Sequence, residues 1–262
     1  MMAFINIAGR LHETTIVRPK QQLTTGTAYL LLHEGLGCVE LWKGFPELLA
    51  NASGCDVVAY SRGGYGKSSP VELPRSLDYM TEEAEVWLPQ LIQQLNYERI
   101  ILVGHSDGGS IALIYAGTSN DGKLAGVITL AAHVFNEPIC VAGIQQAKQA
   151  YQQGKLRQGL ALYHGDNVDC AFWGWNDVWL NPAFLNFNIE AYLNNIQVPL
   201  LVVQGEDDEY GTLAQVESIV LQAGGYAEAL VIPSCKHSIH RQASDQLILA
   251  ICKFTEQKLQ IN

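Results

Sequence analysis

The sequence has little positive charge and no long hydrophobic run. Lysine and arginine number 16 against 26 aspartates and glutamates, so the formal net charge of the 262 residues is −10. A surface of this sign repels phosphate backbones and anionic lipid headgroups. The longest apolar stretch, residues 124–135, is interrupted by Thr129 and His133 and is too short to cross a bilayer. We therefore expect neither nucleic acid nor a membrane as a partner.

Export signals, paired cysteines and zinc motifs are also missing. The first residues, MMAFIN, form neither a basic nor a long apolar segment, so no signal peptide is predicted. The six cysteines are scattered without a C-x-x-C pair, and H-E-x-x-H is absent. Free thiols are typical of a reducing compartment. The sequence therefore predicts a cytoplasmic protein with no disulfide framework and no metal site.

What is present is an alternation of short apolar runs with helical patterns. The composition is ordinary for a globular chain, with 48% hydrophobic residues, and the length suits one large α/β domain or a domain with an insertion. The apolar runs are 28–32, 56–60, 100–104, 127–131, 199–204 and 229–232. The amphipathic segments between and after them are 39–49, 81–95, 106–117, 212–223 and 244–259. Continuous hydrophobicity indicates strands that are buried on both faces. The pattern predicts an α/β fold with a mostly parallel, twisted sheet flanked by helices.

The alternation stops once, between residues 133 and 196. Residues 144–162 have a helical pattern, and residues 171–187 are rich in tryptophan and phenylalanine. A loop of this length without secondary structure is improbable in a compact domain. We interpret residues 133–196 as a small helical cap, inserted before the penultimate strand between the two parts of the core, 1–132 and 197–262.

The segment Gly104-His105-Ser106-Asp107-Gly108-Gly109 matches G-x-S-x-G. An apolar strand pattern precedes it and a helical pattern follows it. A nucleophile elbow needs this context, because a sharp turn from strand to helix presents the serine hydroxyl above the sheet. A glycine-rich turn with a serine N-cap is the alternative interpretation. The two flanking patterns favour Ser106 as a nucleophile.

A serine hydroxyl is a weak nucleophile and needs a general base and an orienting acid. On such a sheet both partners follow later strands, the acid before the histidine. The run 199–204 is followed by four acids, residues 206–209, and the run 229–232 is followed by His237 and His240. Both partners are therefore available at the expected places.

The whole chain resembles the α/β-hydrolase superfamily. The resemblance is carried by HEGLG (33–37), YSRGGYGKS (60–68), GHSDGG (104–109), GEDDEYGT (205–212) and CKHSIHR (235–241). It implies that Asp208 is the acid, with Asp207 as the alternative. It also implies that His237 is the base, with His240 as the alternative. Residues 62–68 resemble a loop that packs beside the oxyanion loop in that family, and Ser61 stands where a phosphate-binding P-loop needs glycine.

The HEGLG segment falls where the family has its oxyanion loop. Two backbone N–H groups must face the carbonyl oxygen as it gains charge. The resemblance implies that Asp107 supplies one and Gly35 the other. Glu34 stands where the family usually has glycine, so Leu36 remains an alternative to Gly35. His33 is expected to fix the loop.

The resemblance implies a serine hydrolase that cleaves a carboxylic ester or related acyl bond without a cofactor. Trp173, Trp175 and Trp179 are expected to pack the cap onto the core, to line an apolar substrate pocket, or to do both. Glu34 and Leu36 are expected in the same pocket. Alternatives are a carbon–carbon bond hydrolase or lyase of the same fold, a haloperoxidase side activity, and a slow hydrolase acting as a ligand receptor. A small-molecule substrate is the expected partner, and a homodimer is left open.

Overall fold

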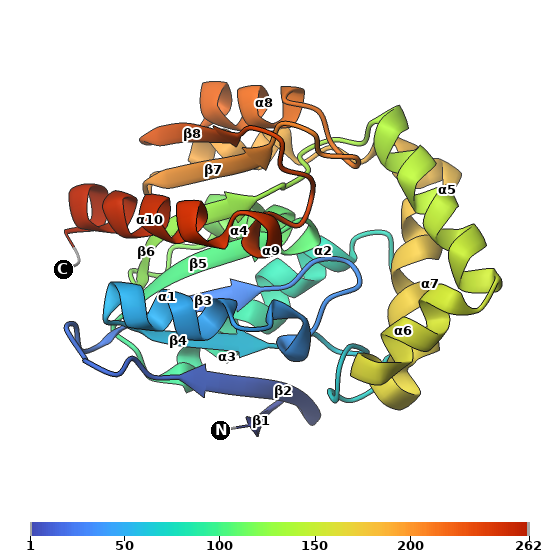
Figure 1. The fold of residues 1–262 in the computed structure, drawn as a ribbon, viewed down its shortest axis with the longest axis horizontal. Coiled ribbons are helices and arrows are strands. Elements are labelled where there is room, and N and C mark those ends of the chain that lie inside the picture. The colour runs from blue at the N-terminus through green and yellow to red at the C-terminus, as the bar shows by residue number, and fades with distance from the viewer. Residues whose placement is uncertain (1, 261–262) are drawn as a thin grey trace.

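The sheet places the carboxyl ends of its parallel strands along one edge. In the computed structural model, which describes residues 2–260, eight strands form one sheet in the order β1-β2-β4-β3-β5-β6-β7-β8 (Figure 1). β1 pairs with β2, and β2 with β4, in antiparallel fashion, and the remaining pairs are parallel. The strands are β1 (Met2–Ile7), β2 (Arg10–Val17), β3 (Thr27–Leu32), β4 (Asp56–Tyr60), β5 (Arg99–His105), β6 (Leu124–Leu130), β7 (Leu200–Gly205) and β8 (Ala227–Ile232).

The predicted fold class is confirmed, and the six predicted strands correspond to β3–β8 with small shifts at their ends. Every residue of β3, β4 and β7 is buried, which explains their continuous hydrophobicity. The β1–β2 hairpin was not predicted. The buried positions of β2 are occupied by polar residues, His12, Glu13 and Thr14, so no apolar run marks the strand.

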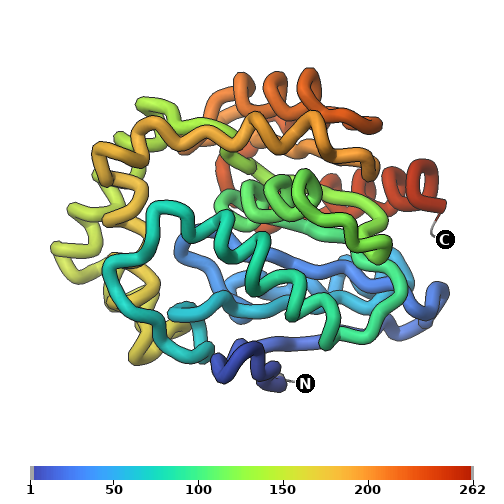
Figure 2. Tube along the Cα trace, turned by 180° about the vertical axis from the view of Figure 1, so that it is seen from behind, coloured from blue at the N-terminus to red at the C-terminus, as the bar shows by residue number. Residues whose placement is uncertain are grey.

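Helices cover both faces of the sheet. One face is covered by α1 (Phe45–Ser53) and α10 (Ser244–Phe254), which lie in front in Figure 1 and supply Phe45, Leu49 and Ile251 to one core cluster. The opposite face, seen in Figure 2, carries α3 (Leu88–Leu95), α4 (Asp107–Thr118) and α8 (Ala214–Gln222). Shorter pieces are η1 (Val39–Trp42), α2 (Tyr79–Glu82), α9 (Ile239–Gln242) and the π-helical turns η2 (Glu83–Trp87) and η6 (Thr255–Leu259).

The segment between β6 and β7 is helical throughout most of its length. α5 (Pro138–Gln152), α6 (Lys155–His164) and α7 (Val168–Trp179) stand beyond the carboxyl ends of the strands (Figure 1). The single helix expected over 144–162 is two helices, because Gly154 adopts a φ of +90° between them. The short helices η3 (Gly165–Asn167), η4 (Pro182–Asn186) and η5 (Glu190–Asn195) complete the segment, and η5 packs on α4 and α8 of the core.

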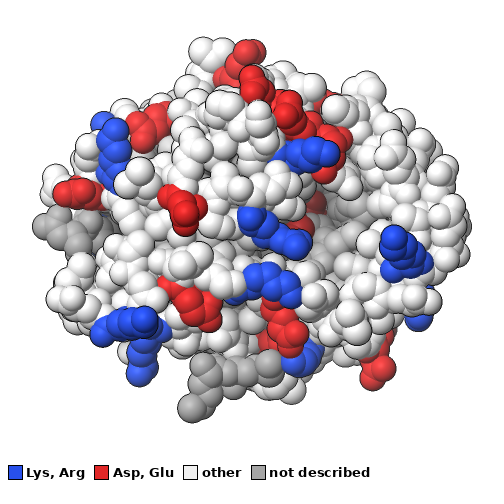
Figure 3. Space-filling view, in the orientation of Figure 1, with Lys and Arg blue, Asp and Glu red and all other residues white. Residues whose placement is uncertain are grey.

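The space-filling view shows a hollow between the body of the molecule and the side formed by α5–α7 (Figure 3).

No helix within residues 2–260 is both long and apolar enough to span a bilayer.

Candidate active site

Ser106 occupies the turn between β5 and α4 with a backbone conformation that few residues adopt. Its φ and ψ are 53° and −118°. The turn is held because the Ser106 N–H donates to the Leu130 carbonyl at 2.8 Å, while the Ser106 carbonyl accepts from the Gly109 N–H at 2.8 Å. Such strain persists only where the surroundings enforce it, and it is concentrated at functional sites.

Glycine is required at positions 104 and 108 because other backbone atoms lie very close to both. A Cβ atom on Gly104 would lie 2.2 Å from the carbonyl oxygen of Gly108. A Cβ atom on Gly108 would lie 2.0 Å from the carbonyl oxygen of Leu32. Any side chain at either position would therefore push α4 away from β3 and β5, and Ser106 would leave its place above the sheet.

His237 and Asp208 form a pair at the neighbouring strand ends. His237 Nδ1 lies 2.9 Å from Oδ1 and 3.0 Å from Oδ2 of Asp208. The Asp208 carboxylate also accepts from the Gln204 side-chain amide and the Tyr210 N–H, each at 2.8 Å. Burial acts to raise the pKa of Asp208, but the hydrogen bond and charge of His237 outweigh it and leave the pKa below its usual value. Asp208 is therefore a carboxylate that orients the imidazole.

The alternatives to this pair lie elsewhere. Asp207 is exposed, and its N–H donates to the Cys235 carbonyl. His240 is buried against Trp42, with 4.8 Å between ring centroids, and is absent from the cavity that contains Ser106 and His237. Within residues 2–260 the Ser106 hydroxyl makes no hydrogen bond; catalytic hydrogen bonds of unliganded enzymes are often long and tighten on substrate binding.

The loop after β3 is tied down by His33 and Arg62. Buried His33 donates from Nδ1 to the Glu34 carbonyl at 2.7 Å and accepts from the Arg62 N–H at Nε2, 3.1 Å away. The Arg62 guanidinium donates to the carbonyls of His33, at 2.7 Å, and Glu34, at 3.1 Å. Burial holds the pKa of His33 well below its ordinary value, so the ring is neutral and this tautomer is fixed. Gly35 and Leu36 then line the cavity beside Ser106.

The Asp107 side chain is a feature that sequence reasoning missed. Its carboxylate is buried, accepts hydrogen bonds from the Tyr79 hydroxyl and, at 3.3 Å, from Trp179 Nε1, and lies 3.8 Å from the Arg62 guanidinium. Burial raises the pKa of Asp107, although Arg62 and both hydrogen bonds oppose the rise. The side chain thus fixes the first turn of α4, and the Asp107 N–H is left without an acceptor among residues 2–260.

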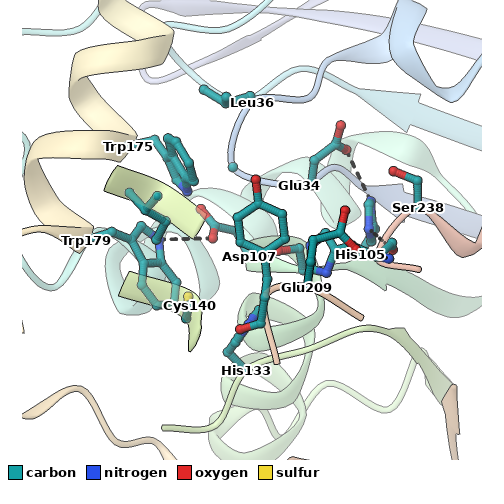
Figure 4. A pocket seen from close by; sticks show the side chains of 15 residues that line it. Glu34, Leu36, His105, Asp107, His133, Cys140, Trp175, Trp179, Glu209 and Ser238 are labelled. Carbon is teal, nitrogen blue, oxygen red and sulfur yellow. Dashed lines mark hydrogen bonds and ion pairs between the residues drawn. The ribbon is translucent and has the colours of Figure 1, made fainter. Parts of the chain in front are cut away.

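Gly35, Ser106, Asp107 and His237 line one cavity of about 240 Å³, which Figure 4 shows from close by. Of the predicted pocket residues, Glu34, Leu36, Trp175 and Trp179 line it. Sequence reasoning did not single out the other lining residues, His105, His133, Cys140, Ile144, Glu209, Tyr210 and Ser238. Several of these residues come from helices and loops whose packing on the core cannot be predicted from local sequence patterns.

Trp173 is not among the residues that line this cavity, and its contacts match packing, one of the two roles expected for it. Its indole packs on Tyr151 and Phe172, at 5.5 and 5.0 Å between ring centroids, beside the Lys148 ammonium. On a helix, residues two positions apart point roughly 200° from each other, whereas residues four apart share a face. Trp175 and Trp179 therefore face the cavity together, and Trp173 faces Tyr151 and Lys148 of α5.

Within the described residues, no group of three or more histidine, cysteine, aspartate or glutamate side chains is arranged to hold a metal ion. The six cysteines are all unpaired.

The fold and the sequence define the class of this protein. Residues 29–188 match the family described as the alpha/beta hydrolase fold, and the chain belongs to that family. Similar solved structures include a proline iminopeptidase from Mycobacterium smegmatis (TM-score 0.76, 16% identity, 99% of both chains covered). An esterase from Exiguobacterium antarcticum is similar too (TM-score 0.76, 17% identity, 98% of this chain and 100% of that chain covered). A serine hydrolase involved in carbazole degradation, the CarC enzyme, matches with TM-score 0.74 and 16% identity over 97% of this chain and 98% of that chain. At these identities the likeness shows a common fold.

Proposed function

We propose that this protein is a serine hydrolase that cleaves a carboxylic ester or related acyl bond of a small apolar or aromatic substrate. One observation carries the proposal: Ser106, on its strained turn, and His237, paired with Asp208, line the same cavity. A serine nucleophile, a histidine base and a buried carboxylate are the groups that acyl transfer needs.

In this mechanism the Ser106 oxygen attacks the substrate carbonyl and His237 accepts its proton. Asp208 holds Nδ1 of His237, so Nε2 is the nitrogen that takes the proton and later returns it to the leaving group. The N–H groups of Asp107 and Gly35 stabilise the oxyanion, each by about 2.7–4 kcal/mol. Water then attacks the acyl-enzyme with His237 again as base, which releases the acid and restores Ser106.

The lining of the cavity supports the substrate class. Ile144, Trp175, Trp179 and Tyr210 give it apolar and aromatic walls, and the first three of these come from α5 and α7, beyond the sheet. On this proposal residues 133–196 act as a cap that excludes water from the acyl-enzyme. Each buried substrate methylene stabilises binding by about 0.8 kcal/mol until the volume is filled.

The test combines a fluorophosphonate probe with p-nitrophenyl esters of C2 to C10 acids. We expect the probe to label Ser106, and kcat/KM to rise with chain length and then fall once the acyl chain exceeds the cavity. Absence of labelling at Ser106 would contradict the proposal. Labelling without ester turnover, together with cleavage of a carbon–carbon bond in a diketone panel, would assign the site to the alternative reaction.

A further inference from the structure

His105, the residue before the candidate nucleophile, directs both ring nitrogens at hydrogen-bond acceptors. Nε2 lies 3.0 Å from the backbone carbonyl oxygen of His237, and Nδ1 lies 3.4 Å from Oε2 of Glu34 (Figure 4). The His105 ring is only 1% exposed, whereas the Glu34 side chain is 26% exposed. A carbonyl and a carboxylate accept and do not donate. Two such partners require two N–H donors, which the ring provides only as an imidazolium.

The charge of Glu34 agrees with this assignment. Burial acts to raise the pKa of Glu34, but the hydrogen bond of His105 outweighs it, so the pKa lies well below its usual value. Glu34 is therefore a carboxylate at neutral pH and has no proton to offer Nδ1.

Three titratable groups face His105 from the elements packed around it. They are Glu34 from the loop after β3, His237 from the loop after β8, and His240 from α9, whose ring centroid lies 5.0 Å away. Burial lowers the pKa of His240 to about 3, so that neighbour is neutral. The His105–Glu34 contact therefore joins two segments that both line the cavity.

We propose that His105 is a positioning residue that, as an imidazolium, joins the oxyanion loop to the loop of the catalytic base. One end of the ring holds Glu34, which directly precedes Gly35, and the other end holds the backbone of His237 itself. The inference rests on the proposed function, because it concerns the geometry of the same reaction. Displacement of a reacting group by about 1 Å costs on the order of 100-fold in rate.

Three substitutions at this position separate the two contacts. His105→Phe removes both donors and keeps a ring beside Trp42 and His240. His105→Gln keeps a donor near the Nε2 position, toward the His237 carbonyl, and His105→Asn keeps one near Nδ1, toward Glu34. We expect His105→Phe to lower kcat by about 10- to 100-fold with little change in KM, and Gln or Asn to recover part of the loss. The matched control His240→Phe, in the same aromatic cluster, should leave kcat unchanged.

Protonation is read directly, without activity. In histidine-labelled protein, ¹⁵N NMR should show both His105 nitrogens protonated, and in Glu34→Gln only one. Circular dichroism and thermal unfolding establish that each variant is folded. The rate of Ser106 phosphonylation by the fluorophosphonate should fall with kcat in His105→Phe.

The outcomes separate the inference from the proposed function. If wild-type Ser106 is not labelled, the serine mechanism fails, while the NMR result still decides the charge of His105. If Ser106 is labelled and a folded His105→Phe keeps wild-type kcat, or if only one His105 nitrogen carries a proton, the positioning role is refuted.

Discussion

At the residue scale, the chemistry of the site depends on the hydrogen-bond partners of its buried polar groups. Asp208 has three donors around its carboxylate, from His237, Gln204 and the Tyr210 N–H. Asp207, one position earlier, has an exposed side chain. Consecutive residues in a loop point in different directions, so adjacent acids acquire different chemistry. The sequence contains both acids as candidates, and only the directions of their side chains in the structure distinguish them.

Asp208→Asn should therefore lower kcat/KM far more than Asp207→Asn. The amide in place of the carboxylate favours the wrong tautomer of His237, for which a loss on the order of 10⁴ is expected. The measurement is steady-state kinetics on the best p-nitrophenyl ester. The reverse order of the two variants would move the acid role to Asp207.

The lowered pKa of buried His240 predicts how the stability of the fold depends on pH. Its pKa in the folded protein is lowered to about 3 by burial, whereas the ordinary value is 6.5. Between these values the unfolded chain binds a proton that the folded chain does not, so folding stability falls as the pH falls. His240 alone should change the free energy of unfolding by up to about 1.4 kcal/mol per pH unit.

Urea unfolding of wild type and His240→Phe from pH 4 to pH 7 tests this slope. The variant should lose less stability toward acid, while other buried histidines, such as His133, maintain part of the slope in both proteins. Equal slopes would show that His240 is protonated in the folded state.

At the element scale, the strands could be predicted because burial on both faces leaves a continuous apolar run. The β1–β2 hairpin could not, since its buried positions carry His12, Glu13 and Thr14. His12 and Glu13 find partners only after the loop 61–68 packs on them, and Thr14 donates to the His12 carbonyl. The break between α5 and α6 was also missed, because a glycine inside a helical pattern is compatible with both continuation and termination.

Substitution of two helical glycines tests how tightly the turn at Ser106 is packed, with Gly108 beside that turn and Gly159 away from it. Gly108→Ala would place a Cβ atom 2.0 Å from the Leu32 carbonyl oxygen and should destabilise the fold by about 3 kcal/mol. Gly159→Ala, in α6, meets nothing within 4 Å and should stabilise it by about 0.5–1 kcal/mol. Chemical denaturation of both variants provides the comparison. A Gly108→Ala protein of wild-type stability would mean that α4 is not fixed against β3.

The two faces of α7 give a further prediction. Trp179→Ala should alter the dependence of kcat/KM on acyl chain length, because this indole lines the cavity and donates to Asp107. Trp173→Ala should lower Tm and leave that dependence unchanged, because its indole packs on Tyr151 and Phe172. An altered chain-length profile in Trp173→Ala alone would reverse the assignment of the two faces.

At the scale of the whole molecule, the site is assembled from loops that follow β3, β5, β7 and β8, all at one edge of the sheet. Because the carboxyl ends of parallel strands meet at that edge, the strand pattern predicts Ser106, Asp208 and His237 there. Asp208 pairs with His237, and Ser106 lines the same cavity as His237. The helical segment is different. His164 of α6 accepts from the Gly66 N–H at 2.9 Å and donates to the Leu36 carbonyl at 3.0 Å. Contacts across such separations leave no local pattern, so the cavity walls could not be predicted. A cytoplasmic location and a homodimer stay predictions.

The central claim is that Ser106 becomes covalently acylated during turnover. The most direct measurement is rapid-quench mass spectrometry with a p-nitrophenyl ester, followed by peptide mapping. We expect an acyl adduct on Ser106 that forms and decays at rates consistent with kcat, and its absence in Ser106→Ala, with kcat lowered by a factor on the order of 10⁴–10⁶. Full turnover by Ser106→Ala, or an adduct on a different residue, would contradict the account.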